Sequence, residues 1–316
     1  MPANACKPLT PEQATNISAP QTPRDVVIIY KSAVYNFEDR KQLRGLYSNN
    51  KSNSRIHVVF SIGMPRSSGG NVFHRDGFDV VLAERAGEKL LENAKTINKT
   101  LSMLKMEVEE YSDLLVGDYE DSYYNLTLKM FYTFQWAARF CRPYEPIFVF
   151  MDDDYAVNPA RLSEFLNYKE SKHEYDFAHG YALNYNPVHR PGSRFTKWAF
   201  SKQEVPWPRH PVEHLGVFSI WSYNFVHDMA LAMHFVKPLV VDDTWLAMVQ
   251  LKLKMRFTGV PGMFLNMDQY PGAKCEEILF APVEEMKKRK CPAWFEVPPP
   301  PLPPCIPWHS SSFVLE

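Results

Sequence analysis

The sequence has no long apolar run and almost no net charge. Its 316 residues include 35 Lys and Arg against 36 Asp and Glu, and 45% of them are hydrophobic. Chains that bind nucleic acid or anionic lipid usually have a basic excess, so this composition excludes a protein built around polyanions. No stretch approaches the roughly 18 apolar residues that cross a bilayer, and residues 1–24 contain no signal-peptide core. We therefore expect a soluble globular chain without a targeting segment.

Cysteine is scarce and irregularly spaced. The cysteines are Cys6, Cys141, Cys275, Cys291 and Cys305. They form no C-x-x-C pair and the histidines show no metal-ligand spacing, so the sequence does not predict a zinc site. An odd number of cysteines fits either a reducing cytosol or a secreted enzyme with one or two disulfides and a spare thiol. Cys275 and Cys291 are a candidate pair. Triplets for N-glycosylation at Asn16, Asn50, Asn98 and Asn125 favour the secretory route.

Proline is concentrated at the two ends of the chain. Half of the 26 prolines lie in residues 1–24 and 292–307. We interpret residues 1–24 as a stem-like, disordered segment and residues 291–316 as a proline-rich tail. Residues 298–304 are expected to form polyproline II, either as a solvated spacer or as a docking segment for an SH3-like partner. One domain is expected between these ends, over residues 25–290.

Strand and helix patterns alternate within that domain. Runs rich in β-branched residues predict buried strands at 25–30, 55–62 and 146–151, with a brief strand at 114–116. Helices are expected at 37–47 and 125–140. Apolar residues at helical spacing predict one more helix, packed on the sheet by Leu90, Ala94, Ile97, Leu101, Leu104, Val108 and Tyr111. Residues 64–77 are expected to be a loop. The alternation predicts a single α/β domain with a doubly wound, mostly parallel sheet.

An acidic triplet follows the strand at 146–151. Adjacent carboxylates at Asp152, Asp153 and Asp154 repel each other, and a divalent cation removes that cost. Alternate residues of extended chain point the same way, so Asp152 and Asp154 are expected to face one site and Asp153 another. The alternative is a solvated turn or a helix start near Asn158. Either way the triplet lies where α/β proteins bind ligands, at the carboxyl ends of the strands.

A second acidic pair, Asp242 and Asp243, precedes another helical run. Carboxylates at a helix start can simply complement the helix dipole, in which case they should be exposed and replaceable. The functional alternative is a general base that takes a proton from a bound hydroxyl.

Further motifs stand in a fixed order along the chain. The most specific one, D-Y-E-D-S-Y-Y-N-L-T-L-K at residues 118–129, fits the pattern D-F-x-D-x-Y-x-N-L-T-L-K almost position by position. Residues 40–47 look like R-x-x-I-R-x-T-W, with Tyr47 for the Trp. Residues 194–198 read R-x-x-K-W, and Asp242-Asp243-Thr244 stands at E-D-V. From about Val26 to Met263 these motifs resemble the β-1,3-galactosyltransferase family. That family includes β-1,3-N-acetylglucosaminyltransferases and, more distantly, Fringe, and this chain looks like a divergent, invertebrate-like member.

The resemblance implies a GT-A glycosyltransferase fold and an inverting transfer to the 3-hydroxyl of an acceptor glycan on a glycolipid or glycoprotein. It implies a UDP-sugar donor and Mn²⁺, with Mg²⁺ as an alternative. Galactose is the family default for the donor sugar, and N-acetylglucosamine and N-acetylgalactosamine stay open. It also implies a Golgi membrane enzyme with a lumenal catalytic domain. Residues 1–24 would then be a stem remnant, and the anchor would lie upstream of Met1 or have been lost.

The resemblance also assigns roles to residues. Asp243 is the expected catalytic base. Asp154, assisted by Asp152 or Asp153, would hold the metal on the diphosphate, and Asp153 would also reach the ribose. Arg44 and Lys129 are expected to bind uracil or phosphate, and the alternatives for each are a surface residue or a structural ion pair.

Some positions depart from the family pattern. The family's P-P-Y-C-S-G-G-G-Y-V-L-S aligns without gaps to residues 211–222, where only Gly216 of the three glycines remains. Glycine lets the backbone approach a ligand closely. Val217 and Phe218 replace the other two glycines and are therefore expected to narrow or reshape the ligand site at this strand. Phe150 replaces a basic residue and Ala247 a glycine. These departures leave two rival interpretations, a non-catalytic relative that binds UDP-sugars or glycans and an interaction protein that acts through its proline-rich tail.

Overall fold

The computed structural model describes residues 5–6, 24–48, 56–66, 70–93, 95–183, 186–289 and 291. The expected stem over residues 1–24 and the expected tail over residues 291–316 lie almost entirely outside these ranges. So does the polyproline segment at 298–304.

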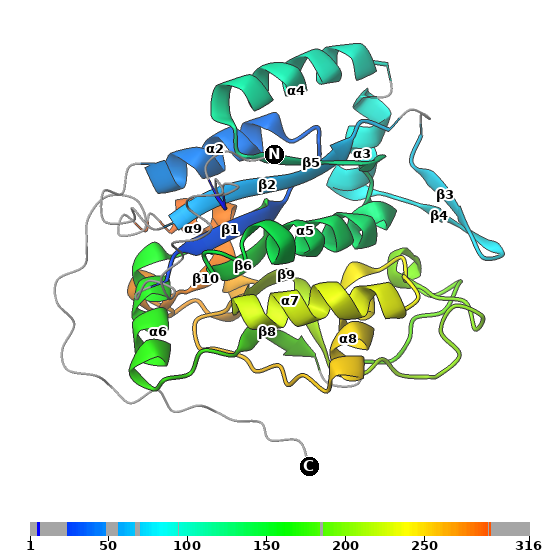
Figure 1. Ribbon diagram of the computed structural model, residues 1–316. Coiled ribbons are helices and arrows are strands. Elements are labelled where there is room, and N and C mark those ends of the chain that lie inside the picture. The colour runs from blue at the N-terminus through cyan, green and yellow to red at the C-terminus, as the bar shows by residue number, and fades with distance from the viewer. Residues whose placement is uncertain are drawn as a thin grey trace.

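A six-stranded sheet forms the centre of the molecule (Figure 1). Its strands are β1 (Val26–Lys31), β2 (Ile56–Met64), β5 (Leu114–Glu120), β6 (Ile147–Asp152), β8 (Ala178–Leu183) and β9 (Glu213–Trp221). Their order is β5-β2-β1-β6-β9-β8. The first four run parallel, whereas β9 is antiparallel to both β6 and β8. This confirms the mostly parallel α/β sheet and adds an antiparallel edge that the sequence patterns did not predict.

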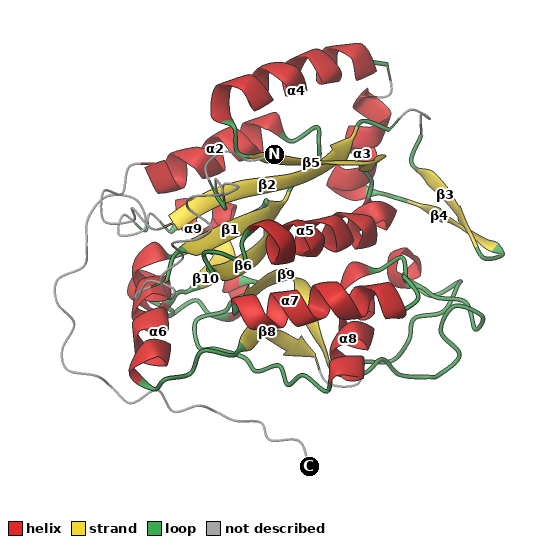
Figure 2. Ribbon diagram, viewed as in Figure 1, coloured by secondary structure: helices red, strands yellow, loops and turns green. Residues whose placement is uncertain are grey.

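Helices cover both faces of the sheet (Figure 2). One face carries α2 (Phe37–Ser48), α3 (Glu84–Asn93), α4 (Ile97–Tyr111), α6 (Pro159–Ser171) and α9 (Val283–Lys288); the other carries α5 (Leu126–Phe140), α7 (Tyr223–Ala232) and α8 (Asp242–Leu253). Residues of β1 alternate between the two faces: Ile28 and Tyr30 pack with the first group, Val27 and Ile29 with the second. No helix in the described ranges is both long and apolar enough to cross a membrane.

Short elements complete the fold. Strands β3 (Val72–Arg75) and β4 (Phe78–Val81) form a hairpin, and β7 (Tyr155–Val157) pairs with β10 (Phe280–Pro282). Short 3₁₀ helices are η2 (Tyr123–Asn125), η3 (Thr196–Trp198), η4 (Met233–Phe235), η5 (Met267–Gln269) and η6 (Cys275–Glu277). The loop predicted over residues 64–77 is therefore partly wrong, because its second half enters the hairpin. Gly77 forms the turn with a φ of 82°, which a side chain would strain.

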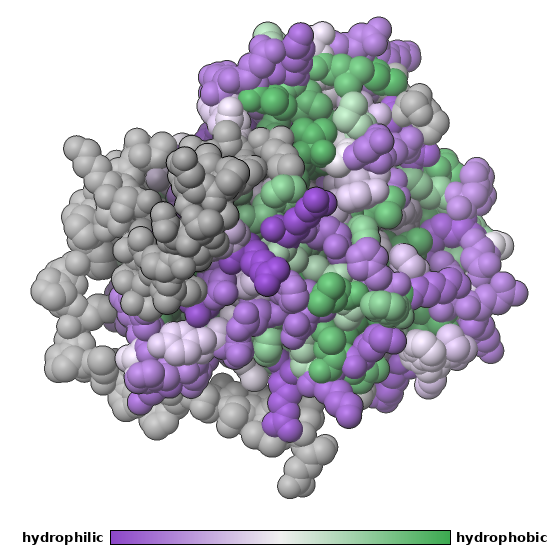
Figure 3. Space-filling view, viewed as in Figure 1, coloured by the Kyte–Doolittle hydropathy of each residue, from purple (hydrophilic) through white to green (hydrophobic). Residues whose placement is uncertain are grey.

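The single helix expected over residues 90–111 is also wrong, because α3 ends at Asn93 and α4 begins at Ile97. Leu104 packs in the core, but Leu101, Val108 and Tyr111 are 36%, 40% and 38% exposed. Glu107 takes a buried position on α4 because two arginines of α2 bind its carboxylate. A buried ion pair, and not the apolar stripe, therefore determines which side of α4 faces the core. Part of the apolar stripe stays exposed, and Figure 3 shows hydrophobic surface near α4.

Two disulfides occur among the described residues, one local and one between distant segments. Cys275–Cys291 confirms the candidate pair, with the Cα atoms 5.5 Å apart. Cys6–Cys141, with a Cα separation of 4.7 Å, joins the N-terminal segment to the residue that follows α5. Cys305 lies outside the described residues. Two bridges match the secretory alternative for the cysteine count.

Candidate functional site

The strand order places a ligand-binding crevice between β1 and β6. From β1 the sheet continues to β2 on one side and to β6 on the other, so the chain reverses its winding at this point. Ligands of open α/β sheets bind outside the carboxyl ends of the strands at such a switch point. The parallel register pairs Lys31, the last residue of β1, with Asp152, the last residue of β6. The predicted position of the acidic triplet at this edge is therefore confirmed.

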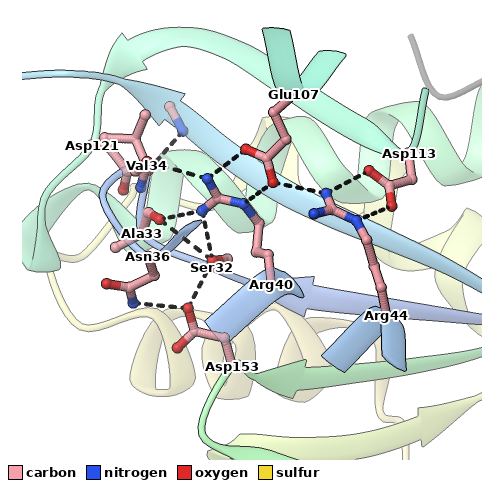
Figure 4. Close-up of polar contacts among 11 residues, drawn as sticks. Ser32, Ala33, Val34, Asn36, Arg40, Arg44, Glu107, Asp113, Asp121 and Asp153 are labelled. Atoms are coloured by element: carbon pink, nitrogen blue, oxygen red, sulfur yellow. Dashed lines mark hydrogen bonds and ion pairs between the residues drawn. The ribbon is translucent and has the colours of Figure 1, made fainter. Parts of the chain in front are cut away.

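The three carboxylates of the triplet have different surroundings. Asp152 lies 2.9 Å from the Lys31 ammonium. Asp153 accepts hydrogen bonds from Ser32 Oγ at 2.7 Å and Asn36 Nδ2 at 2.8 Å, both in the loop between β1 and α2 (Figure 4). Asp154 is exposed. Asp152 and Asp153 thus diverge, one toward α8 and the other toward α2, but Asp153 and Asp154 lie in a turn between β6 and β7, as in the turn alternative, and not in extended chain.

Lys31 joins the two acidic features of the sequence. Its Nζ lies 2.9 Å from Asp152 Oδ1 and 3.2 Å from Asp242 Oδ2, and the residue is only 6% exposed. The motifs did not single out Lys31. The available signal was a lysine that ends an otherwise apolar buried strand, at the edge where parallel strands end.

Gly216 makes room for this ion pair. A Cβ at position 216 would lie 3.2 Å from Lys31 Nζ and 3.5 Å from Asp242 Oδ2. The one glycine retained from the family's three therefore stands where a side chain would press on the buried charges. Val217 lines the cavity described below, as expected. The expectation for Phe218 is wrong, because its ring is fully buried and stacks on Phe280 at a centroid distance of 4.8 Å.

The start of α8 presents Asp243 to the same region. The backbone N–H of Thr244 donates to Asp243 Oδ1 at 2.7 Å, and the Thr244 hydroxyl donates to Glu213 Oε2 at 3.3 Å. Burial, together with the charges of Asp242 and Glu213, raises the pKa of Asp243 to about 7. The helix-capping alternative predicts exposed carboxylates, but Asp242 is 5% exposed and no side chain caps α8. That alternative is therefore wrong for Asp242.

These groups surround a cavity of about 380 Å³. Its lining includes Lys31, Asp152, Glu213, Gly216, Val217, Asp242, Asp243 and Thr244, with Tyr123, His189, Lys197, Trp198 and His210 among the others. The Trp198 indole N–H donates to the Tyr123 hydroxyl at 2.7 Å, which holds an exposed aromatic face at the cavity wall. A carboxylate of raised pKa beside an aromatic wall suits proton abstraction from a sugar hydroxyl.

Arg44 lies outside this cavity, in a network between α2 and α4 (Figure 4). Its guanidinium binds both carboxylate oxygens of Asp113, at 2.6 and 2.8 Å, and lies 2.8 Å from Glu107. The neighbouring Arg40 is fully buried and binds the same Glu107 through two nitrogens, at 2.8 and 2.7 Å. The ion-pair alternative therefore describes Arg44, and its donor-binding role stays a prediction without geometric support.

Lys129 is likewise held in a structural pair. Its Nζ donates to Asp121 at 2.9 Å and to the Ser32 carbonyl. The other carboxylate oxygen of Asp121 accepts from the backbone N–H groups of Val34 and Gly63, each at 2.9 Å. Lys129 thus positions the loop between β1 and α2, which carries the donors to Asp153, and it does not line the cavity. Its role toward uracil or phosphate also stays a prediction.

Removing the shared carboxylate of this network should destabilise the fold. In a Glu107→Gln variant, Arg40 and Arg44 stay buried with less negative charge beside them, which should lower the free energy of unfolding by about 3 kcal/mol. Denaturant melts of the two proteins measure this difference. The network reaches Asp153 through Arg40 and the Ser32 hydroxyl, so the affinity for UDP is measured as well and should fall by no more than about tenfold if the network only supports the fold.

Within the described residues, no group of three or more His, Cys, Asp or Glu side chains is arranged to hold a metal ion. Asp152 is engaged by Lys31, and one oxygen of Asp153 by Ser32 and Asn36. A hard cation of the Mg²⁺ type needs only one or two protein carboxylates when a diphosphate and water supply its other ligands. The exposed Asp154, beside Asp153, fits that limited requirement. The metal role of Asp152 stays a prediction.

Comparison with known proteins points to one family. A galactosyltransferase family model matches residues 90–260. β-1,3-Galactosyltransferase 5 of Mus musculus is 31% identical over 156 residues, 48% of this chain and 47% of that protein. The human UDP-GlcNAc:βGal β-1,3-N-acetylglucosaminyltransferase 9 is 26% identical over 248 residues, 78% of this chain and 56% of that protein. The human lactosylceramide 1,3-N-acetyl-β-D-glucosaminyltransferase is 24% identical and covers 72% of this chain and 54% of its own length. The chain thus spans about half the length of these relatives.

Among solved structures, mouse xyloside xylosyltransferase 1 in its apo form is 12% identical and covers 75% of this chain and 85% of that one, with a TM-score of 0.29.

Proposed function

Because this chain belongs to the galactosyltransferase family, we propose that it is an active β-1,3-glycosyltransferase that moves a hexose from a UDP-sugar to the 3-hydroxyl of an acceptor glycan, with inversion. The observation that carries the proposal is the position of Asp243. Its partly buried carboxylate lines the cavity at the carboxyl edge of the sheet, and a backbone N–H fixes one of its oxygens. A fixed carboxylate with a free lone pair can take a proton from a hydroxyl as that hydroxyl attacks.

In the proposed mechanism the acceptor enters the cavity from solvent. Its 3-hydroxyl donates a hydrogen bond to Asp243 and attacks the anomeric carbon of the donor from the face opposite UDP. Asp243 takes the hydroxyl proton as the new bond forms and the bond to UDP breaks. The single positive charge of Lys31 offsets part of the negative charge of Asp152 and Asp242, which favours an ionised Asp243 among its acidic neighbours.

The donor nucleotide would lie at the switch point between β1 and β6. Asp153 would accept a hydrogen bond from a ribose hydroxyl, and the bonds that Ser32 and Asn36 donate to its carboxylate support this role. Asp154 would hold Mn²⁺ or Mg²⁺ on the diphosphate, assisted by Asp153 or Asp152. Such a cation, when bound, offsets the charge that develops on the departing UDP.

The donor sugar, the acceptor and the location of the enzyme belong to the same proposal. Galactose is the first candidate, since the matched family model carries that name, and N-acetylglucosamine and N-acetylgalactosamine follow. The acceptor is a glycan of a glycolipid or a glycoprotein, and no nucleic acid is involved. We place the enzyme in the Golgi lumen, and the two disulfides support an oxidising compartment. The expected anchor and the partner of the proline-rich tail concern residues outside the described ranges.

A transfer assay tests this proposal directly. The purified full chain is given UDP-galactose, UDP-N-acetylglucosamine or UDP-N-acetylgalactosamine with a panel of β-glycosides, and the products are identified by mass and linkage. Transfer in a β-1,3 linkage from one donor supports the proposal, and loss of transfer with a chelator, restored by Mn²⁺, supports the metal. Tight UDP binding without transfer from any donor would favour the non-catalytic alternative.

The rate should rise with pH if Asp243 is the base. Its pKa of about 7 means that the carboxyl group loses its proton only as the pH passes neutrality. Since only the ionised form accepts a proton, kcat/KM should fall tenfold per pH unit well below about pH 7 and level off above it. Initial rates from about pH 5 to about pH 9 measure this profile. A flat profile over that range would contradict the assignment.

A further inference from the structure

Two residues that depart from the family pattern contact each other beside Asp243. In the alignment without gaps, Glu213 stands at the family's Tyr, and Thr244 stands at the Val of E-D-V. Glu213 begins β9 and Thr244 lies in the first turn of α8, 31 residues later. The Thr244 hydroxyl donates to Glu213 Oε2 at 3.3 Å. The two changes therefore form one polar pair, where the family pattern has a phenol and an apolar side chain.

Glu213 keeps hydrogen-bonding capacity toward the cavity. It is 5% exposed, and Asn186 Nδ2 donates to its Oε1 at 3.2 Å. Each carboxylate oxygen can accept two hydrogen bonds, and each one here receives a single bond from the residues described. A buried carboxylate without a cation is costly, and no ion pair to Glu213 occurs within the described ranges. The side chain nevertheless lines the cavity, where a ligand could supply the missing donors.

Thr244 ties Glu213 to the proposed base. Its backbone N–H holds Asp243 and its hydroxyl holds Glu213, so one residue orients both carboxylates at the cavity wall. A sugar ring that places one hydroxyl on Asp243 would bring a second hydroxyl within reach of Glu213. Asp242 and Asp243 lie close by, so burial and repulsion between like charges disfavour a further negative charge in this part of the cavity.

We propose that Glu213 determines acceptor specificity: its carboxylate accepts a hydrogen bond from a second hydroxyl of a neutral acceptor sugar, and it excludes acceptors that carry a carboxylate or sulfate at that place. This inference rests on the proposed function, because it assigns the cavity to the acceptor. Glu213 takes no part in breaking or forming bonds to the donor.

Matched neutral and anionic glycosides test the proposal. Wild-type protein and a Glu213→Gln variant are compared on p-nitrophenyl β-galactoside and β-glucoside and on the corresponding galacturonide and glucuronide. A lost hydrogen bond to a charged group should raise KM for the neutral glycoside about tenfold, with kcat within about twofold. The ratio of kcat/KM for the neutral glycosides to kcat/KM for the anionic glycosides should fall by about the same factor.

Two further variants sharpen the comparison. A Glu213→Tyr, Thr244→Val double variant restores the family pair and should lose the discrimination against uronides as Glu213→Gln does. A Glu170→Gln variant on α6, on the other side of the sheet, removes one carboxylate elsewhere and should behave like wild type.

The outcomes separate this inference from the proposed function. Wild-type transfer with unchanged KM and unchanged neutral-to-anionic ratio in Glu213→Gln would overturn the specificity role and leave the enzyme assignment intact. If wild type transfers no sugar, binding of the same glycosides in the presence of UDP, measured by saturation-transfer NMR, still decides. Weaker binding of the neutral glycoside by Glu213→Gln supports the specificity role, and equal binding by both proteins refutes it.

Discussion

An Asp243→Asn variant should lose sugar transfer by about a thousandfold or more while it still binds UDP. Asparagine keeps the size of the side chain and can accept the Thr244 N–H that now holds Asp243 Oδ1. It cannot take a proton from the acceptor hydroxyl, and general-base catalysis is typically worth 10²–10⁴-fold. Since burial and the neighbouring carboxylates disfavour the ionised aspartate, the neutral variant should fold at least as stably as wild type. Transfer kinetics, UDP calorimetry and a denaturant melt measure these three expectations.

A matched control for this variant is Asp228→Asn on α7, an exposed aspartate away from the crevice. It removes one negative charge and should retain wild-type transfer. Full transfer by Asp243→Asn would refute the base assignment. Loss of UDP binding together with transfer would instead place Asp243 in the donor site.

A Lys31→Met variant should lose both stability and activity. Removing the ammonium leaves Asp242 buried and Asp152 half-buried without their common cation. Breaking a buried ion pair from one side costs about 3–5 kcal/mol, so we expect a loss of that order in the free energy of unfolding. Transfer should fall by about a hundredfold, because the start of α8 is no longer held against the end of β1 and Asp243 shifts with it. Denaturant melts and transfer kinetics give the two numbers.

A second variant separates charge compensation from simple loss of structure. In Lys31→Met with Asp242→Asn, the buried carboxylate that needed the cation is gone, so much of the lost stability should return. The coupling between the two substitutions, obtained from a double-mutant cycle, should be at least about 1 kcal/mol for such a contact. Additive effects of the two substitutions would show that Lys31 does not act through Asp242.

The sequence was most informative where one local pattern determines the structure. Apolar runs fixed the parallel strands, and Asn158 caps α6 through its side chain as a helix start near that residue required. The acidic triplet lies at the expected edge because parallel strands place their carboxyl ends together. The pairing of Cys275 with Cys291 was likewise accessible, since only 16 residues separate them.

The site was less predictable because its residues are brought together by the antiparallel strand. β9 runs against β6, with Met151 opposite Phe218, so its first residues extend past the end of β6. Glu213 is therefore the first residue of its strand, whereas a search for residues that follow strands finds only the triplet. The role of Lys31 could not be predicted for another reason. A single lysine at a strand end forms no recognisable motif, and its partner Asp242 lies 211 residues away in the sequence. Arg44 showed the reverse case, a motif arginine with one partner, Glu107, on a helix whose buried side the apolar pattern did not identify and another, Asp113, just after that helix.

Gly216 has a consequence for how this family can vary. Because a Cβ there would lie 3.2 Å from the Lys31 ammonium and 3.5 Å from Asp242 Oδ2, a side chain at this position would oblige the lysine head group to shift by a few tenths of an ångström. The same shift would lengthen the contacts of Lys31 with Asp152 and Asp242. The absence of a side chain at position 216 therefore sets how tightly an internal cation is held at this crevice.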